Sequence, residues 1–140
     1  MAGLLAPGLA AVFVLLACWH IGMAAAPSPG QGAVPSVDGK PLFTPSRAAT
    51  VVVALVLLLF AALMAAAGGI IKTGLSAGLL TGLCYALALG LLARAIGDFK
   101  YLGLFKRVRG SRFATLDTFL YSPLCLLLAA GVGTVASVRA

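Results

Sequence analysis

The chain has 140 residues, of which 62% are hydrophobic and 9% are charged. Soluble domains are about half apolar and a quarter charged, so this composition excludes an ordinary soluble protein. Ten Lys and Arg stand against three Asp, which gives a net charge of +7. A helix needs about 20 residues to cross a bilayer core. We therefore predict one all-α membrane domain, a bundle of four transmembrane helices.

The first apolar run covers residues 3–26. Its end, Ala24-Ala25-Ala26, resembles the cleavage site of a signal peptide. However, no Lys or Arg precedes the run, and Pro27 would directly follow the cut. We therefore expect a retained first span, followed by a Pro- and Gly-rich loop over residues 27–44.

The second span is predicted over residues 45–67, whose centre carries no charge. Thr44 is expected to cap this helix, because Pro45 suits its first helical position. Gly68 and Gly69 then end it.

The third span is predicted over residues 74–96 and has a small residue at every fourth position. A stripe of this kind lets a second helix approach closely, and we expect the partner helix to lie in the same chain. The stripe consists of Gly74, Gly78, Gly82, Ala86 and Gly90.

The fourth span is predicted over residues 117–138, after a polar loop over residues 97–116. A helix starting only at Pro123 would be too short to cross the core comfortably. We therefore expect the helix to begin near Asp117 and to adjust its geometry at Pro123.

The basic residues predict the orientation, because Lys and Arg favour cytoplasmic loops. Placing loops 27–44 and 97–116 in the cytoplasm leaves eight of the ten basic residues inside, and only Lys72 and Arg139 outside. Both termini would then be extracytoplasmic. The expected location is the inner (plasma) membrane.

Three stretches resemble a known family. They are CWHIG near the end of the first span, VPSVDGKPLFTPSRAAT in the first loop, and RAIGDFKYLGLFKRVRGSRFATLDTFLYSPLCLLL near the end of the chain. Together they resemble the bacterial small integral membrane proteins of domain-of-unknown-function family 3995. The resemblance implies a helical membrane protein with four spans, and it implies no particular activity.

The predicted topology brings five polar side chains to a similar depth, where ionisable residues often mark a site. These candidate ligand-binding residues are His20, Arg94, Asp98, Asp117 and Tyr121. If they form a site, we expect Arg94 to contact Asp98 or Asp117, because an unpaired charge at that depth is costly, and His20 to approach from the first span. Each has a structural alternative. Arg94 could reach the headgroups with Asp98 as its neutralising partner, Asp117 could cap its helix, Tyr121 could be an interfacial aromatic, and His20 could be a structural histidine.

Loop 97–116 interleaves aromatic and aliphatic residues with cations, a pattern that suits a membrane surface. The expected membrane-surface residues are Lys100, Lys106, Arg107, Arg109 and Arg112. The predicted partners are anionic membrane lipids, and the alternative role of the cations is to set topology. Nucleic-acid binding is disfavoured, because the membrane orientation already explains the same cations.

Three functional hypotheses remain open. The chain could bind a small amphiphile or a lipid headgroup at the cytoplasm-facing polar residues. It could be a structural or accessory subunit that packs through the small-residue stripe, against a protein partner or a second copy. It could also be an enzyme acting on a lipophilic substrate, with His20 or Asp117 as base. We found no cofactor motif and no metal-ligand spacing.

Overall fold

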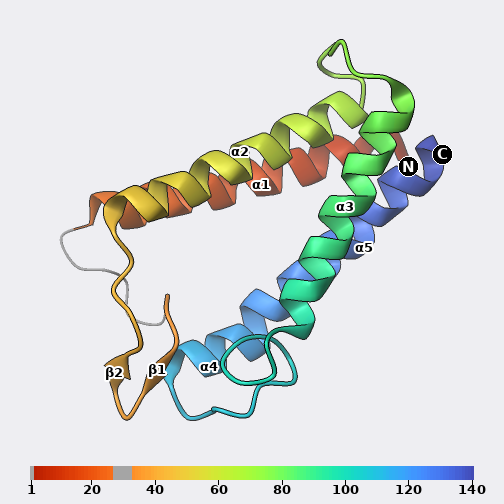
Figure 1. Ribbon diagram of the computed structural model, residues 1–140. Helices are drawn as coiled ribbons and strands as arrows, with labels where there is room; N and C mark the ends of the chain where they lie inside the picture. Colours follow the sequence, from red (N-terminus) through yellow and green to blue (C-terminus); the bar gives the residue numbers. More distant parts are fainter. Residues whose placement is uncertain (1, 27–32) are drawn as a thin grey trace.

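The chain folds into long helices joined by three connections, the first of which contains two short strands (Figure 1). The computed structural model describes residues 2–26 and 33–140, so the start of the predicted loop 27–44 lies outside it. The elements are α1 (Ala2–Ala25), β1 (Ser36–Val37), β2 (Lys40–Pro41), α2 (Arg47–Ala67), α3 (Ala77–Ile96), α4 (Arg112–Leu116), the π-helical turn η1 (Asp117–Tyr121) and α5 (Ser122–Arg139). The predicted all-α fold is confirmed. The two short strands form an antiparallel hairpin between α1 and α2.

Within the described ranges, four helical segments are long and apolar enough to cross a membrane. They are Gly3–Ala25, Arg47–Ala67, Ala77–Ile96 and Arg112–Arg139. Their outer surfaces carry large apolar side chains, among them Leu59, Phe119 and Leu127, which are 67%, 79% and 71% exposed. Water would solvate such a surface poorly, whereas lipid acyl chains solvate it well.

The four long segments form two antiparallel pairs. Helix α1 packs mainly along α2, and α3 packs mainly along α5. The two pairs meet at the end of the molecule that holds both termini and diverge toward the β1–β2 hairpin (Figure 1). Arg139, at the end of α5, links the two pairs where they meet. It donates a hydrogen bond to the carbonyl of Ala67, the last residue of α2.

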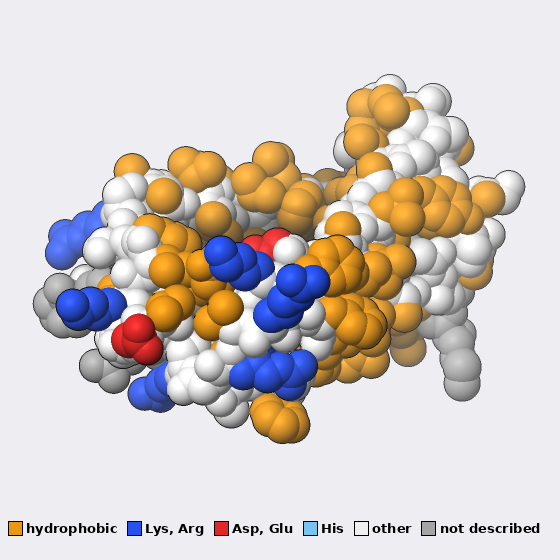
Figure 2. All heavy atoms as spheres, turned by 60° about the horizontal axis from the view of Figure 1, so that its bottom comes forward, with side chains coloured by type: hydrophobic (Ala, Val, Ile, Leu, Met, Phe, Trp, Pro, Cys, Tyr) orange, Lys and Arg blue, Asp and Glu red, His pale blue; other side chains and the backbone are white. Residues whose placement is uncertain are grey.

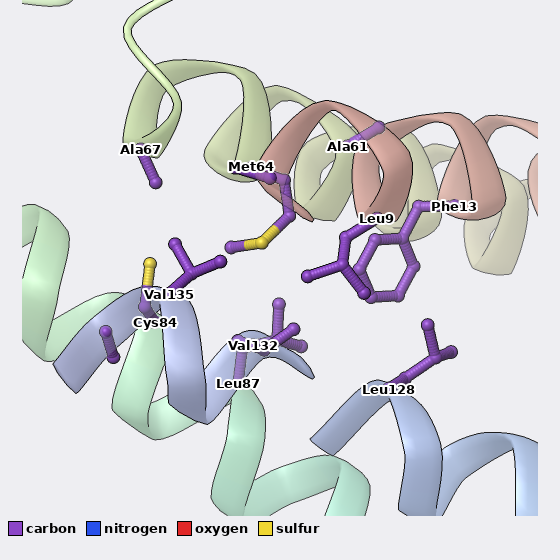
Figure 3. Packing of buried hydrophobic residues seen from close by; sticks show 12 residues of the cluster. Leu9, Phe13, Ala61, Met64, Ala67, Cys84, Leu87, Leu128, Val132 and Val135 are labelled. Atoms are coloured by element: carbon purple, nitrogen blue, oxygen red, sulfur yellow. The ribbon is translucent and has the colours of Figure 1, made fainter. Parts of the chain in front are cut away.

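A buried apolar cluster joins the two pairs (Figure 3). Phe13 of α1 meets Phe60 of α2 edge-on, with ring centroids 5.6 Å apart. Gly131 of α5 lies against α1, since a Cβ atom built at this glycine would be 3.0 Å from a terminal methyl of Leu9. In lipid such packing stabilises by close van der Waals contact, so a small residue at this position brings α1 and α5 together.

The expected close packing through the small-residue stripe of the third span is wrong within this chain. Helix α3 packs through Leu80, Cys84 and Leu87, and the five stripe residues are exposed. A Cβ atom built at Gly78 or Gly82 would meet no described atom within 4 Å. Residues two apart on a helix differ by about 200° around its axis, so the stripe lies on the face opposite the packed one.

The caps of α2 and α3 move their starts from the predicted positions. Ser46, not Thr44, caps α2 and accepts the N–H of Ala49 at 3.0 Å. Helix α3 begins after Ser76, whose hydroxyl accepts the N–H of Leu79 at 3.3 Å. Gly74 therefore precedes the helix. In both cases a serine hydroxyl satisfies a backbone donor that the first turn leaves free.

The fourth span begins earlier than predicted, at Arg112, where Ser111 caps the helix. Asp117 is consequently not its N-cap. The expected adjustment at Pro123 takes the form of η1, in which the N–H of Ser122 bonds the carbonyl of Asp117 five residues back. Proline lacks an N–H and crowds the carbonyl four residues before it, and the wider π-turn accommodates both effects.

Both longer connections lie at the same end of the molecule, opposite the termini. Residues 34–45 and 108–112 line a common hollow there. Figure 2 looks at this loop end and shows basic side chains distributed among hydrophobic ones. Eight of the ten basic residues lie in these connections or next to them: Lys40, Arg47, Arg94, Lys100, Lys106, Arg107, Arg109 and Arg112.

Candidate functional site

The centre of the loop end is the buried carboxylate of Asp117, which is 0% exposed. Its Oδ1 accepts hydrogen bonds from Arg94 Nη2 at 2.9 Å and from Ser122 Oγ at 3.1 Å. Its Oδ2 accepts from the backbone N–H of Gly103 at 2.7 Å and from Lys106 Nζ at 3.2 Å. One side chain therefore joins α3, the basic loop and the start of the fourth span.

Lys106 is the second buried member of this cluster and is 2% exposed. Its ammonium group donates to the Gly103 carbonyl at 2.9 Å, to Thr118 Oγ1 at 2.6 Å and to Asp117. These three bonds use the full donor capacity of an ammonium group. Lys106 is therefore not a membrane-surface residue as predicted, because its charge points into the protein and not toward headgroups.

The Asp117 cluster holds α3, loop 97–116 and the fourth span together. It consists of Asp117, Arg94, Gly103, Lys106, Thr118 and Ser122. Two cations share one carboxylate, and removing one partner of such a buried pair typically costs about 3–5 kcal/mol, since the other charge stays buried without compensation. Arg94 is the more open member, with a side chain that is 33% exposed. Its Nη1 has no hydrogen-bond partner among the described residues. The carboxylate itself is enclosed, so it is not available as a general base or as a ligand contact.

Two glycines allow the basic loop to cross itself next to this cluster. Gly97 and Gly103 have φ values of +84° and +86°. A Cβ atom at Gly97 would lie 1.9 Å from the Leu102 carbonyl oxygen, and one at Gly103 would lie 2.2 Å from the Ile96 carbonyl oxygen. Both the positive φ and the close approach of the backbone require glycine. The crossing directs the N–H of Gly103 toward Asp117.

Asp98 organises the turn inside this loop and does not contact Arg94. Its Oδ1 accepts the backbone N–H groups of Lys100, Tyr101 and Leu102 at 2.8–2.9 Å. These bonds favour the ionised form, and they hold the pKa of the Asp98 carboxyl below its usual value. Of the two acids considered as partners for Arg94, the structure pairs it with Asp117.

The remaining two candidate residues are His20, which lies in α1, and Tyr121, which lies four residues after Asp117. His20 bonds the carbonyl of Leu16 in its own helix at 2.7 Å. Helix α1 belongs to the other helix pair, which diverges from α4 at this end (Figure 1). Tyr121 lies in η1 and packs its ring against Phe113 at a centroid distance of 5.9 Å. The expected approach of His20 to the cluster is therefore wrong.

The other four predicted membrane-surface residues are exposed: Lys100, Arg107, Arg109 and Arg112. Exposed aromatic side chains lie between them in the sequence, with Phe99 at 56% and Phe105 at 62%. Lys100 also places its ammonium 4.9 Å from the centroid of the Tyr101 ring. The loop thus presents cations and apolar rings together, the combination that suits a headgroup layer.

A hollow of about 720 Å³ opens between the β1–β2 hairpin and the segment 108–112. Its walls combine apolar residues with hydroxyls and charges. The charged residues in the lining are Asp38, Arg109 and Arg112. Arg109 is oriented by a 3.3 Å hydrogen bond from its Nε to the carbonyl of Lys106. The backbone of Lys106, whose side chain bonds Asp117, therefore orients one charged residue of the hollow's lining.

The sequence did not predict that Gly103, Lys106 and Ser122 bond Asp117, and it did not predict the hollow. Lys106 has the same local context as its exposed neighbours, and Ser122 and Thr118 look like ordinary polar residues of a helix start. One signal was available. Gly97 and Gly103 enclose Asp98 in a chain with only three acids, a pattern that favours a tight loop held by carboxylates.

No curated protein and no solved structure matches this chain. A protein family matches it over residues 5–132, which is most of its length and includes α2, α3, both longer connections and parts of α1 and α5. The family is described as "Protein of unknown function (DUF3995)". The resemblance noted in the sequence is thereby confirmed, and the chain belongs to the DUF3995 family.

Proposed function

We propose that this protein is a multi-pass protein of the inner (plasma) membrane that binds anionic lipid headgroups at its loop end. The observation that carries the proposal is the exposed set Lys100, Arg107, Arg109 and Arg112 at one end of four apolar helices. Within the described ranges, both ion pairs of the chain end on Asp117, and neither involves these four cations.

The physical basis is the attraction between unpaired cations and an anionic leaflet. Each basic residue near such a surface contributes about 1 kcal/mol, and salt weakens the attraction. Phe99 and Phe105 add apolar contact beside the charges. Relative to the hypothesis drawn from the sequence, the headgroup contact moves from the five cytoplasm-facing polar residues to the exposed basic surface, because the Asp117 carboxylate is enclosed.

Native mass spectrometry of the purified protein in an uncharged detergent tests this proposal. Equal amounts of phosphatidylglycerol and phosphatidylcholine are added, and the lipid adducts are counted. We expect adducts of phosphatidylglycerol to dominate, because the exposed cations attract its net negative charge. Phosphatidylcholine is a zwitterion and has no net charge. Equal adducts of the two lipids would overturn the proposal.

A second candidate function, an accessory subunit, draws on the exposed stripe of α3. Gly78, Gly82 and Ala86 are exposed, and a Cβ atom built at Gly78 or Gly82 would meet no described atom within 4 Å. Small residues on a lipid-facing surface allow a helix of another chain to approach. Replacing Gly82 with Leu would then abolish a cross-linked complex in membranes while leaving the stability of the isolated chain unchanged. An unchanged cross-linking pattern would remove this candidate.

The enzyme hypothesis gains no support from the geometry. His20 and Asp117, the two bases considered, lie on different helix pairs, and Asp117 has no exposed oxygen. A general base must come within hydrogen-bond reach of its substrate.

A further inference from the structure

The hollow at the loop end lies between two segments that are far apart in the sequence. One wall comes from the β1–β2 hairpin and the residues up to the start of α2, and the other from residues 108–112. The first segment belongs to the connection of the α1–α2 pair, and the second leads into the α3–α5 pair. A molecule seated here would contact both halves of the protein at the end where the helix pairs diverge.

Its size and walls suit a polar group that carries an apolar body. Small-molecule sites typically enclose about 300–1,000 Å³, and this hollow has about 720 Å³. Val37, Phe43 and Val108 supply apolar wall, whereas Ser36 and Thr44 supply hydroxyls. This mixture matches the region of a lipid where the headgroup joins the acyl chains.

The charges of the lining favour an anion. Arg109 and Arg112 stand against one acid, Asp38. In the described part of the chain neither arginine forms an ion pair. Guanidinium groups bind phosphate oxygens through paired hydrogen bonds, and two of them on one wall are suited to a phosphate ester.

The geometry points to this hollow as a specific binding site for the phosphate of an anionic phospholipid. This inference rests on the proposed function and deepens it, by assigning the headgroup to Arg109 and Arg112 and not to the basic surface as a whole. The Asp117 cluster does not take part in binding. It holds Lys106, whose carbonyl accepts the hydrogen bond that orients Arg109.

Substitutions of three exposed arginines, made one at a time, distinguish a specific site in the hollow from general attraction to the basic surface. Arg109→Gln and Arg112→Gln remove charges that line the hollow, and Arg107→Gln removes a neighbouring charge outside its lining. Binding of phosphatidylglycerol is titrated in an uncharged detergent. We expect Arg109→Gln and Arg112→Gln to bind about tenfold more weakly, because each loses one charge-assisted hydrogen bond. We expect Arg107→Gln to weaken binding by less than about twofold.

A fourth variant tests the hairpin wall without changing charge. Ser36→Phe fills the hollow from β1, and we expect it to weaken phosphatidylglycerol binding about as much as Arg109→Gln does. Thermal unfolding of each variant in detergent serves as the folding control. Binding by Ser36→Phe that equals that of the unaltered protein would overturn the site.

The remaining outcomes distinguish this inference from the proposed function. Equal weakening by Arg107→Gln, Arg109→Gln and Arg112→Gln would overturn the site and leave the surface attraction standing. No preference for phosphatidylglycerol in the unaltered protein would overturn both. Soluble glycerol phosphate serves as a competitor, and displacement of the lipid at equal concentration would show that a soluble phosphate ester is the ligand, which contradicts the lipid assignment.

Discussion

Replacing Asp117 with Asn tests whether the buried carboxylate holds the loop end together. The substitution keeps the side chain's shape and removes its charge. Arg94 and Lys106 would lose their shared anion. An amide NH₂ group, which donates hydrogen bonds, would replace a carboxylate oxygen that accepts them. Because Lys106 is buried, we expect a loss of about 3–5 kcal/mol in the free energy of unfolding, the usual cost of breaking a buried pair.

The assay is reversible unfolding in mixed detergent, with circular dichroism as the readout of helix content. Asp38→Asn is the matched control, since Asp38 is exposed, and we expect it to unfold as the unaltered protein does. A double-mutant cycle gives the sharper result. Lys106→Met combined with Asp117→Asn removes both charges, so the pair should cost less than the sum of the single changes. Additive losses, or a loss below about 0.5 kcal/mol for Asp117→Asn, would refute the reasoning.

The remaining predictions concern the glycines and the loop acid. Gly103→Ala should lower the melting temperature in detergent, because its Cβ would lie 2.2 Å from a backbone oxygen; unchanged melting would contradict the backbone crossing. Gly131→Leu should destabilise the chain by separating α5 from Leu9, whereas Gly82→Leu should leave unfolding unchanged; equal effects in the same assay would contradict the packing described. The pKa of the Asp98 carboxyl in the folded chain lies below its ordinary value of 3.8, so the ionised carboxylate stabilises the turn fully above that pH. This stability is lost as the pH falls through the folded-state pKa. Hydrogen exchange at residues 100–102 should therefore show protection at about pH 5 and lose it in stronger acid; protection that does not change with pH would contradict the role of Asp98.

The helices followed from the sequence because hydropathy acts over whole segments. A run such as 47–67 has no polar residue in its centre, so its composition predicts a span without knowledge of its neighbours. Depth also predicted that Arg94 would pair with an acid, since a charge inside a membrane protein needs a partner. The boundaries shifted by a few residues because single serines, Ser46, Ser76 and Ser111, decide where the helices begin.

The site could not be predicted to the same extent, because it depends on the path of a loop. Lys106 is buried and Arg107 exposed, although they are adjacent in the sequence. The difference arises where Gly97 and Gly103 cross and direct the backbone toward Asp117. The small-residue stripe of α3 failed for a related reason. Its periodicity defines a face of the helix, and which face meets a neighbour is determined by the packing of the whole chain.

Binding of headgroups at the loop end requires both longer connections to lie at the cytoplasmic surface of the membrane. Single cysteines introduced at Leu42, Phe105 and Ile70, all exposed, test this in a background without the native cysteines. A membrane-impermeant thiol reagent is applied to intact cells and to inside-out vesicles. We predict that positions 42 and 105 react only in the inside-out vesicles and position 70 only in intact cells. Reaction of positions 42 and 105 from opposite sides would contradict the shared loop end, and reaction of both in intact cells would contradict its cytoplasmic orientation.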